Sequence, residues 1–95
     1  MVYQRIEIPV TPGRESDFEQ TVPRTRAIFE GAKGLRSVMI ARETEGESRY
    51  LLLPQWESME DHQAFHRTPE FHEFRDLIDP LLADRPRIAY FAPLD

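Results

Sequence analysis

Three histidines lie close together in the second half of the chain, and their chemistry is the most distinctive in the sequence. His62, His66 and His72 fall within one eleven-residue stretch. Histidine is the side chain whose unperturbed pKa lies nearest neutral pH, so it is the natural proton acceptor there. His62 and His66 are four residues apart and would share one face of a helix. One of them could point into a cavity as a base, but polar neighbours such as Asp61 and Arg67 favour a solvent-facing position for each.

The same spacing could belong to a metal site, because two histidines four residues apart present both imidazoles on one helix face. Thr68 and Pro69 interrupt that helix before His72, and the H-E-x-x-H signature of zinc enzymes is absent. The chain has no cysteine, which excludes thiolate ligands, thiolate nucleophiles and disulfides. We therefore predict no metal site.

Other side chains could bind a substrate. Trp56 could line a cavity, although tryptophan more often serves as a large apolar packing residue. Tyr50, like Tyr3 and Tyr90, could offer a phenolic hydrogen bond to a substrate oxygen. Arg36 could stabilise an oxyanion. Each is also an ordinary strand residue, and the sequence does not say which face of a sheet it occupies.

The composition is typical of one folded domain, which we place at residues 1–95. Hydrophobic residues make up 40% and charged residues 31% of the chain, which argues against disorder. The net charge of -5 makes nucleic acid and anionic membrane surfaces poor partners, because both attract basic surfaces. No apolar run approaches the ~18 residues that span a bilayer, and the N-terminus lacks the pattern of a secretory signal. We expect a cytoplasmic protein.

The elements that position these residues follow the order strand, helix, strand, strand, helix, strand. Hydrophobic alternation and turn residues predict strands at about 2–10, 35–43, 48–56 and 86–92. A helix is expected over residues 14–31, kinked or divided at Pro23, with a buried stripe of Phe18, Val22, Thr25 and Phe29. Ser58 and Thr68 are expected to cap helix N-termini in the second half. A hairpin through residues 44–47 joins the two middle strands.

The third strand is apolar on both faces. Leu51 and Leu53 point to one side, and Leu52 and Trp56 point to the other, because alternate residues of a strand face opposite sides. Two helices cover one face of a four-stranded sheet, so a second copy of the sheet is the simplest cover for the other face. We therefore predict a homodimer. The alternative is a monomer with a few exposed apolar residues.

The segment from Gln55 to Phe74, QWESMEDHQAFHRTPEFHEF, resembles the W-E-S and downstream proline segment of the antibiotic biosynthesis monooxygenase family. The early Thr11-Pro12-Gly13 turn and the terminal Ala89-Tyr90 fit the same layout, so the resemblance covers nearly the whole chain. It implies an α+β fold of the ferredoxin-like split βαβ type (βαββαβ), with a four-stranded antiparallel sheet. It also implies that two subunits face their sheets together as a dimeric α/β barrel, with a cavity between each sheet and its helices.

The resemblance implies a cofactor-independent monooxygenase that oxidises an aromatic, quinol-like small molecule with dioxygen. Such an enzyme must remove a proton from its substrate in an apolar cavity, and His66 and His62 are the predicted proton acceptors. The residues predicted to bind the substrate are Trp56, Phe65, Tyr50, Arg36, His72 and Phe71. The alternative is a non-catalytic dimer that holds a small apolar ligand. A titratable side chain pointing into the cavity favours the enzyme, whereas a lining of Phe65, Phe71 and Phe74 alone favours binding.

A branch of the resembled family binds and breaks down haem, and this sequence departs from that branch. Phe65 stands where the branch has a cavity tryptophan, and Arg75 stands where it has the histidine that ligates iron. Its first-strand asparagine falls near Ile6. We therefore do not expect haem degradation.

Overall fold

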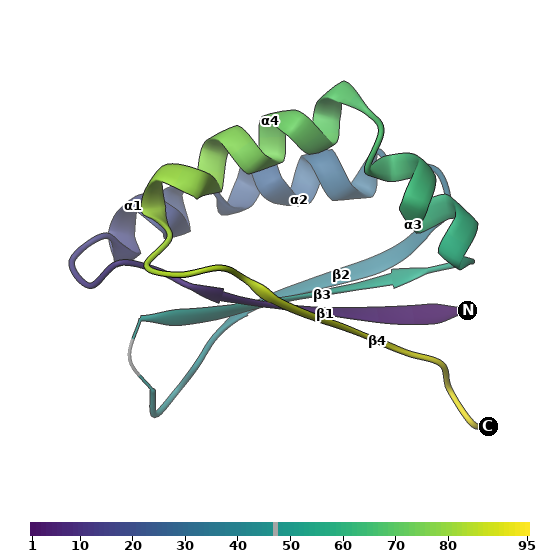
Figure 1. The fold of residues 1–95 in the computed structure, drawn as a ribbon, viewed down its shortest axis with the longest axis horizontal. Helices are drawn as coiled ribbons and strands as arrows, with labels where there is room; N and C mark the ends of the chain where they lie inside the picture. Colours follow the sequence, from purple (N-terminus) through teal and green to yellow (C-terminus); the bar gives the residue numbers. More distant parts are fainter. Residues whose placement is uncertain (47) are drawn as a thin grey trace.

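One antiparallel sheet carries a layer of helices on one of its faces (Figure 1). The structure is a computed structural model that describes residues 1–46 and 48–95. The elements are β1 (Val2–Pro9), α1 (Glu15–Gln20), α2 (Val22–Glu30), β2 (Leu35–Arg42), β3 (Arg49–Trp56), α3 (Met59–Phe65), α4 (Pro69–Ile78), a 3-10 turn (Asp79–Leu81) and β4 (Arg87–Phe91). The strand order is β2-β3-β1-β4 with antiparallel neighbours. This order confirms the predicted ferredoxin-like split βαβ fold.

The helix predicted over residues 14–31 is divided rather than continuous. α1 ends at Gln20 and α2 begins at Val22, so Pro23 falls in the first turn of α2, where its missing N–H costs no helical hydrogen bond. The predicted stripe still faces the sheet, with one half-buried member, Val22, and three buried members, Phe18, Thr25 and Phe29. Of the hairpin predicted through residues 44–47, residue 47 lies outside the described part of the chain.

Two side-chain caps fix where α3 and α4 begin. The Ser58 hydroxyl accepts a hydrogen bond from the backbone N–H of Asp61 at 3.1 Å, and the Thr68 hydroxyl accepts one from Phe71 at 3.2 Å. Each such cap contributes about 1 kcal/mol to helix stability. Both predicted helix starts are confirmed. The Ser58 cap fixes the start of α3, which carries His62 and has His66 as its C-terminal cap.

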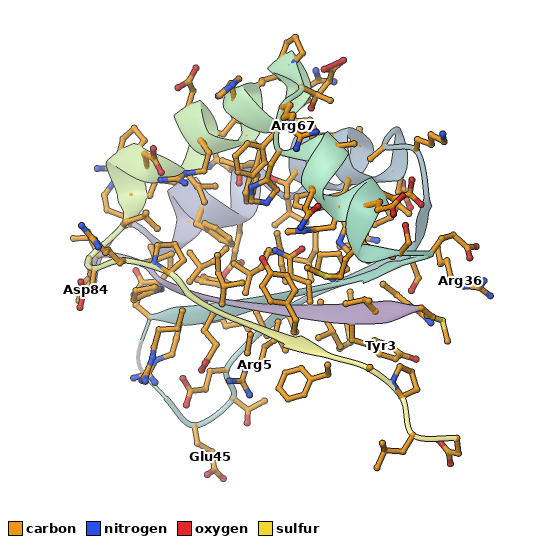
Figure 2. The ribbon with its side chains drawn as sticks, turned by 45° about the vertical axis from the view of Figure 1, so that its right-hand side comes forward. Tyr3, Arg5, Arg36, Glu45, Arg67 and Asp84 are labelled. Carbon is orange, nitrogen blue, oxygen red and sulfur yellow. The ribbon has the colours of Figure 1, made fainter. Side chains whose placement is uncertain are left out.

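The sheet has one covered face and one open face. On β3 the covered face holds Tyr50, Leu52, Pro54 and Trp56, all buried, whereas Leu51 and Leu53 are half-buried on the open face. Figure 2 shows Tyr3 and Arg5 of β1 on that same open side. The prediction of a third strand with two apolar faces is confirmed.

Within the described ranges, no helix is both long enough and apolar enough to cross a membrane.

Candidate active site

His62 lies between α3 and the sheet. The residue is only 4% exposed, and its ring centroid is 5.8 Å from that of Trp56 on β3 and 5.0 Å from that of Tyr90 on β4. Its Nε2 atom lies 3.2 Å from the Tyr90 hydroxyl oxygen. The prediction of a solvent-facing histidine is therefore wrong for His62, because this position of α3 falls on the side that packs against the sheet.

The environment of His62 keeps its imidazole neutral. Burial lowers the pKa of His62 to about 4, and the nearby His66 adds to this effect. A group with this pKa carries no charge at neutral pH. Among the described residues, its Nδ1 atom is buried and has no hydrogen-bond partner. The neutral ring therefore has one nitrogen engaged with Tyr90 and one nitrogen, Nδ1, that is buried without a partner.

His66, at the C-terminal cap of α3, extends the site toward α4. Its ring centroid is 4.4 Å from that of His62, and it stacks on Phe71 with a centroid distance of 4.2 Å and an interplanar angle of 18°. His66 is half-buried, and burial followed by the charge of Arg75 lowers its pKa. Phe65, which is buried, connects the two ends, with ring centroids 5.3 Å from Trp56 and 5.6 Å from Phe71.

This set of rings reaches the molecular surface at the edge strand β4. Tyr90 is 43% and Ile88 is 49% exposed, although both lie on the helix-facing side of the sheet, opposite the buried Gln4 and Ile6 of β1. The helices thus leave part of β4 uncovered beside His62. We call the six residues Trp56, His62, Phe65, His66, Phe71 and Tyr90 the histidine–aromatic cluster.

Gln4 is a buried polar neighbour of this cluster that sequence patterns do not single out. It is 2% exposed, and its Oε1 atom accepts a hydrogen bond from the Trp56 indole N–H at 3.1 Å. Because an indole N–H can only donate, this contact sets the carboxamide oxygen toward Trp56 and its NH₂ group away. The sequence does contain one sign of this residue. Gln4 is the single polar residue in the series Val2, Gln4, Ile6 and Ile8, which shares one face of the first strand.

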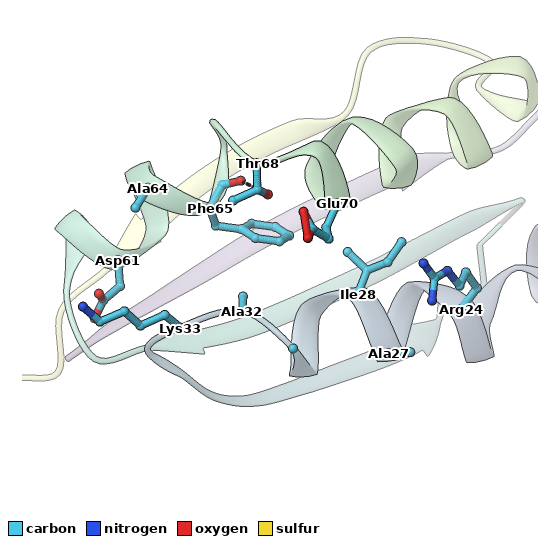
Figure 3. A pocket seen from close by; sticks show the side chains of 11 residues that line it. Arg24, Ala27, Ile28, Ala32, Lys33, Asp61, Ala64, Phe65, Thr68 and Glu70 are labelled. Atoms are coloured by element: carbon cyan, nitrogen blue, oxygen red, sulfur yellow. Dashed lines mark hydrogen bonds between the residues drawn. The ribbon is translucent and has the colours of Figure 1, made fainter.

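A separate pocket of about 280 Å³ opens between α2 and the segment that joins α3 to α4 (Figure 3). Ala27, Ile28 and Phe65 form part of its apolar lining, and Arg24 and Glu70 are among its charged residues. The residues that line it include no histidine, and the carboxylates among them are Asp61 and Glu70. We therefore place the candidate site at the histidine–aromatic cluster, which shares only Phe65 with this pocket.

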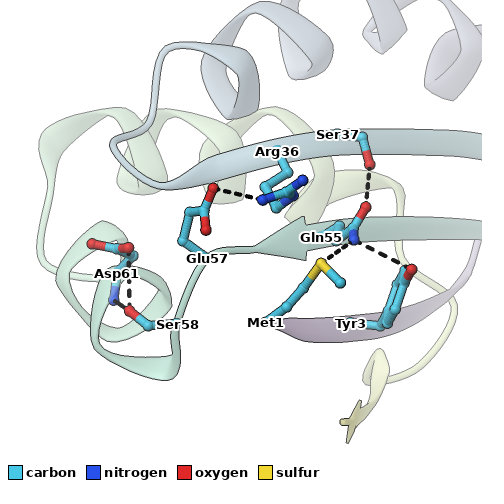
Figure 4. A network of polar contacts seen from close by, with 8 residues as sticks. All are labelled: Met1, Tyr3, Arg36, Ser37, Gln55, Glu57, Ser58 and Asp61. Carbon is cyan, nitrogen blue, oxygen red and sulfur yellow. Dashed lines mark hydrogen bonds and ion pairs between the residues drawn. The ribbon is translucent and has the colours of Figure 1, made fainter. Parts of the chain in front are cut away.

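Three of the residues predicted to bind substrate lie away from the cluster. Tyr50 is at the start of β3, about 20 Å from the other end of that strand, and its hydroxyl donates to Glu19 at 2.5 Å. Arg36 is exposed and forms an ion pair with Glu57 at 2.9 Å (Figure 4). His72 is exposed on α4. The other five predicted residues, His62, His66, Trp56, Phe65 and Phe71, are brought together.

The structure also shows where the residues relevant to metal binding and haem binding lie. Among the described residues, no group of three or more histidine, aspartate or glutamate side chains is arranged to hold a metal ion. Arg75 lies on the exposed side of α4, where its guanidinium pairs with Asp79 at 2.9 Å. Phe65 and Ile6 are both part of the buried core.

Comparison with solved structures supports the fold. A putative antibiotic biosynthesis monooxygenase from Bordetella bronchiseptica is 34% identical, with 98% of this chain and 97% of that chain covered and a TM-score of 0.88. SnoaB, a cofactor-independent oxygenase from Streptomyces nogalater, is 18% identical, with 99% and 93% covered and a TM-score of 0.86. The likeness to SnoaB shows a shared fold.

Comparison with known sequences identifies the family. The chain is 28% identical over 92 residues to an uncharacterized Bacillus subtilis protein, YczJ, covering 96% of this chain and 97% of that one. It is 29% identical over 83 residues to a putative heme-binding protein of Haloarcula marismortui, covering 87% of this chain but 12% of that protein. The sequence model of the antibiotic biosynthesis monooxygenase family matches residues 1–77. Because that match spans most of the chain, the protein belongs to the antibiotic biosynthesis monooxygenase family.

Proposed function

We propose that this protein is a cofactor-independent monooxygenase that oxidises an aromatic, quinol-like molecule with dioxygen, using His62 as the proton acceptor. The observation that carries the proposal is the buried, neutral imidazole of His62, whose Nδ1 atom has no hydrogen-bond partner among the described residues and which is surrounded by aromatic rings. Family membership supports it, as does a fold shared with a cofactor-independent oxygenase.

The lowered pKa of His62 restricts the substrates that it can deprotonate. A base with a pKa of about 4 has less driving force at neutral pH than one poised near 7. Proton transfer then depends on a substrate whose anion is itself well stabilised. Quinols and anthrones meet this condition, because their anions are delocalised over an extended ring system. Delocalised anions of this kind are also electron-rich enough to reduce dioxygen.

The aromatic members of the cluster suit a flat substrate. Trp56, Phe65 and Phe71 make the surroundings of the two histidines apolar and rich in aromatic rings. The stretch of β4 at Ile88 and Tyr90 is not covered by the helices, so the Tyr90 side of the cluster is open to solvent.

Oxygen uptake tests this proposal. Purified protein, free of metal and flavin, is mixed with anthrones, quinols and flavonoid-like phenols in an oxygen electrode. We expect uptake above that of heat-denatured protein for at least one class. Trp56, the single tryptophan of the chain, reports binding through its fluorescence. Quenching of Trp56 without oxygen uptake across the panel would instead support the alternative, a protein that binds a small apolar ligand without converting it.

The open face of the sheet supports the proposal of a homodimer. Met39 and Phe91, which are 50% and 48% exposed, lie on this face beside the half-buried Leu51 and Leu53. A polar row of Ser37, Gln55 and Tyr3 crosses the same face, with hydrogen bonds of 3.1 and 3.2 Å (Figure 4). A second sheet would bury both the apolar surface and this polar row.

We expect a dimer at micromolar concentration and a large loss of dimer affinity in Leu53→Lys. An unpaired charge in an apolar interface is strongly unfavourable, so the dissociation constant should rise at least about 100-fold. The matched control is Gln63→Lys on the exposed side of α3, which should stay dimeric. Light scattering after size exclusion measures each mass. A wild-type mass near the 11.2 kDa monomer would contradict the proposal.

We expect no haem degradation. Arg75 is bound in an ion pair on the exposed side of α4 and cannot ligate iron, and Phe65 fills its position in the core. Titration with haem should give no strong Soret band, and ascorbate should yield no verdoheme-like or biliverdin-like product. A stoichiometric complex with a histidine-ligated spectrum would contradict this prediction, because it would show that His62, His66 or His72 ligates the iron.

A further inference from the structure

We propose that Tyr90 is a positioning residue that holds His62 in one tautomer, with the proton on Nε2, so that Nδ1 is the atom that takes the substrate proton. The catalytic part of this inference rests on the proposed function, but the tautomer does not. Sequence patterns gave Tyr90 no more weight than Tyr3 or Tyr50, and only the folded chain brings it to His62.

The contact between the two side chains allows two arrangements. The Tyr90 oxygen lies 3.2 Å from Nε2 of His62, and either group could be the donor. Burial raises the pKa of Tyr90, so its hydroxyl keeps its proton at neutral pH. The neutral imidazole carries one proton, on Nε2 or on Nδ1. The surroundings of the two side chains decide between these forms.

With the proton on Nε2, every donor of the pair is satisfied. The Nε2–H group donates to the Tyr90 oxygen, and the Tyr90 O–H can donate to solvent because the residue is 43% exposed. Nδ1 then presents a lone pair. With the proton on Nδ1, the Tyr90 O–H must donate to Nε2, and the Nδ1–H is buried without an acceptor among the described residues.

The second arrangement is the less stable one. A buried donor without a partner loses its hydrogen bond to water and gains nothing in return. Native interiors tolerate acceptors with unused lone pairs more often than N–H groups without acceptors. Tyr90 thus favours one tautomer of His62. In this tautomer the Nε2 proton points toward β4 and the Nδ1 lone pair points toward the interior.

The direction has a consequence for the reaction. The proton of the substrate RH₂ passes to Nδ1, and the resulting imidazolium keeps its Nε2–H bond to Tyr90. The anion RH⁻ gives an electron to dioxygen, and a carbon–oxygen bond forms to give the peroxide RHOO⁻. Nδ1 returns its proton to that peroxide, which then loses water. The net reaction is RH₂ + O₂ → RO + H₂O, and His62 ends as it began.

Heteronuclear NMR of isotopically labelled imidazole nitrogens tests the tautomer directly in the ligand-free protein. We expect the wild-type signal of His62 to show a protonated Nε2 and a bare Nδ1. Tyr90→Phe should shift His62 toward a mixture of both tautomers, whereas Tyr3→Phe, on the other face of the sheet, should leave it unchanged. A wild-type His62 with its proton on Nδ1 would overturn the proposal, whatever the variants show.

Steady-state kinetics test the consequence. Tyr90→Phe should lower kcat about twofold, with KM nearly unchanged, because in a mixture of the two tautomers about half of the His62 rings carry their proton on Nδ1 and cannot accept the substrate proton there. Unchanged kcat together with an unchanged tautomer in an active enzyme would refute the role of Tyr90 while leaving the oxygenase intact. A wild-type protein that consumes no oxygen but shows the expected tautomer would refute the proposed function and leave the role of Tyr90 in orienting His62 standing.

Discussion

Replacing His62 by glutamine should lower turnover of the oxidised substrate by about 10²–10⁴-fold, the range that a positioned general base contributes. Glutamine keeps a polar side chain at the contact with Tyr90 but cannot take up a proton. Substrate binding, followed through the fluorescence of Trp56, should change far less. Because burial lowers the pKa of His62 to about 4, the rate should rise with pH through a step well below the usual pKa of histidine, and the variant should lack that step.

The other two histidines provide matched controls for this result. His72 is exposed on α4, so His72→Gln should keep wild-type turnover. His66 touches His62 and stacks on Phe71 but is only half-buried, so His66→Gln should have a smaller effect than His62→Gln. Wild-type turnover in all three variants would show that the protein supplies no histidine base. The substrate would then ionise with the help of another group, such as a tyrosine.

Acidification from pH 7 to pH 4 should weaken the folded protein by about 3 kcal/mol through His62 alone. The folded-state pKa is about 4, whereas the imidazole of an unfolded chain titrates near 6.5. Between these values the unfolded chain binds a proton that the folded chain does not, so the free energy of unfolding falls as the pH falls. Below the folded-state pKa this loss is complete. His66, whose pKa is also lowered by burial, acts in the same direction.

Urea denaturation at a series of pH values measures this effect. Wild-type protein should lose stability steeply across the window from about 6.5 to 4, and His62→Gln should show a shallower slope there. His72→Gln should show the same slope as the wild type, because the imidazole of His72 is already exposed to solvent in the folded protein. Equal slopes for wild type and His62→Gln would show that His62 is solvated in the folded state, contrary to its position between α3 and β4.

Local signals in the sequence were sufficient for the elements of the fold. Ser58 and Thr68 cap helices because their hydroxyls reach backbone N–H groups three residues ahead, a contact that depends on nothing distant. Pro23 marked the division of the first helix for a similarly local reason. The alternation along β3 set which residues share a face.

The orientation of the site depended on contacts between distant segments. Whether His62 faces the sheet is decided by how α3 is rotated, and that rotation follows from the packing of Phe65 and Trp56. Polar neighbours along the chain could not reveal it. Tyr50 and Arg36 were plausible binders by type, yet their positions at the far end of β3 and in a solvent-exposed ion pair became visible only once the strands were paired. Gln4 and Tyr90 meet only across the β1–β4 ladder.

Isotopically labelled dioxygen provides the most direct test of the central claim, that this protein oxidises an aromatic substrate with dioxygen and a histidine base alone. Protein freed of metal and flavin is given the best substrate of the uptake panel under labelled dioxygen, and the product is analysed by mass spectrometry. We predict that one labelled oxygen atom enters each product molecule, and that His62→Gln forms this product at least about 100-fold more slowly. Product that carries only oxygen from water, or a His62→Gln rate equal to the wild-type rate, would contradict the account.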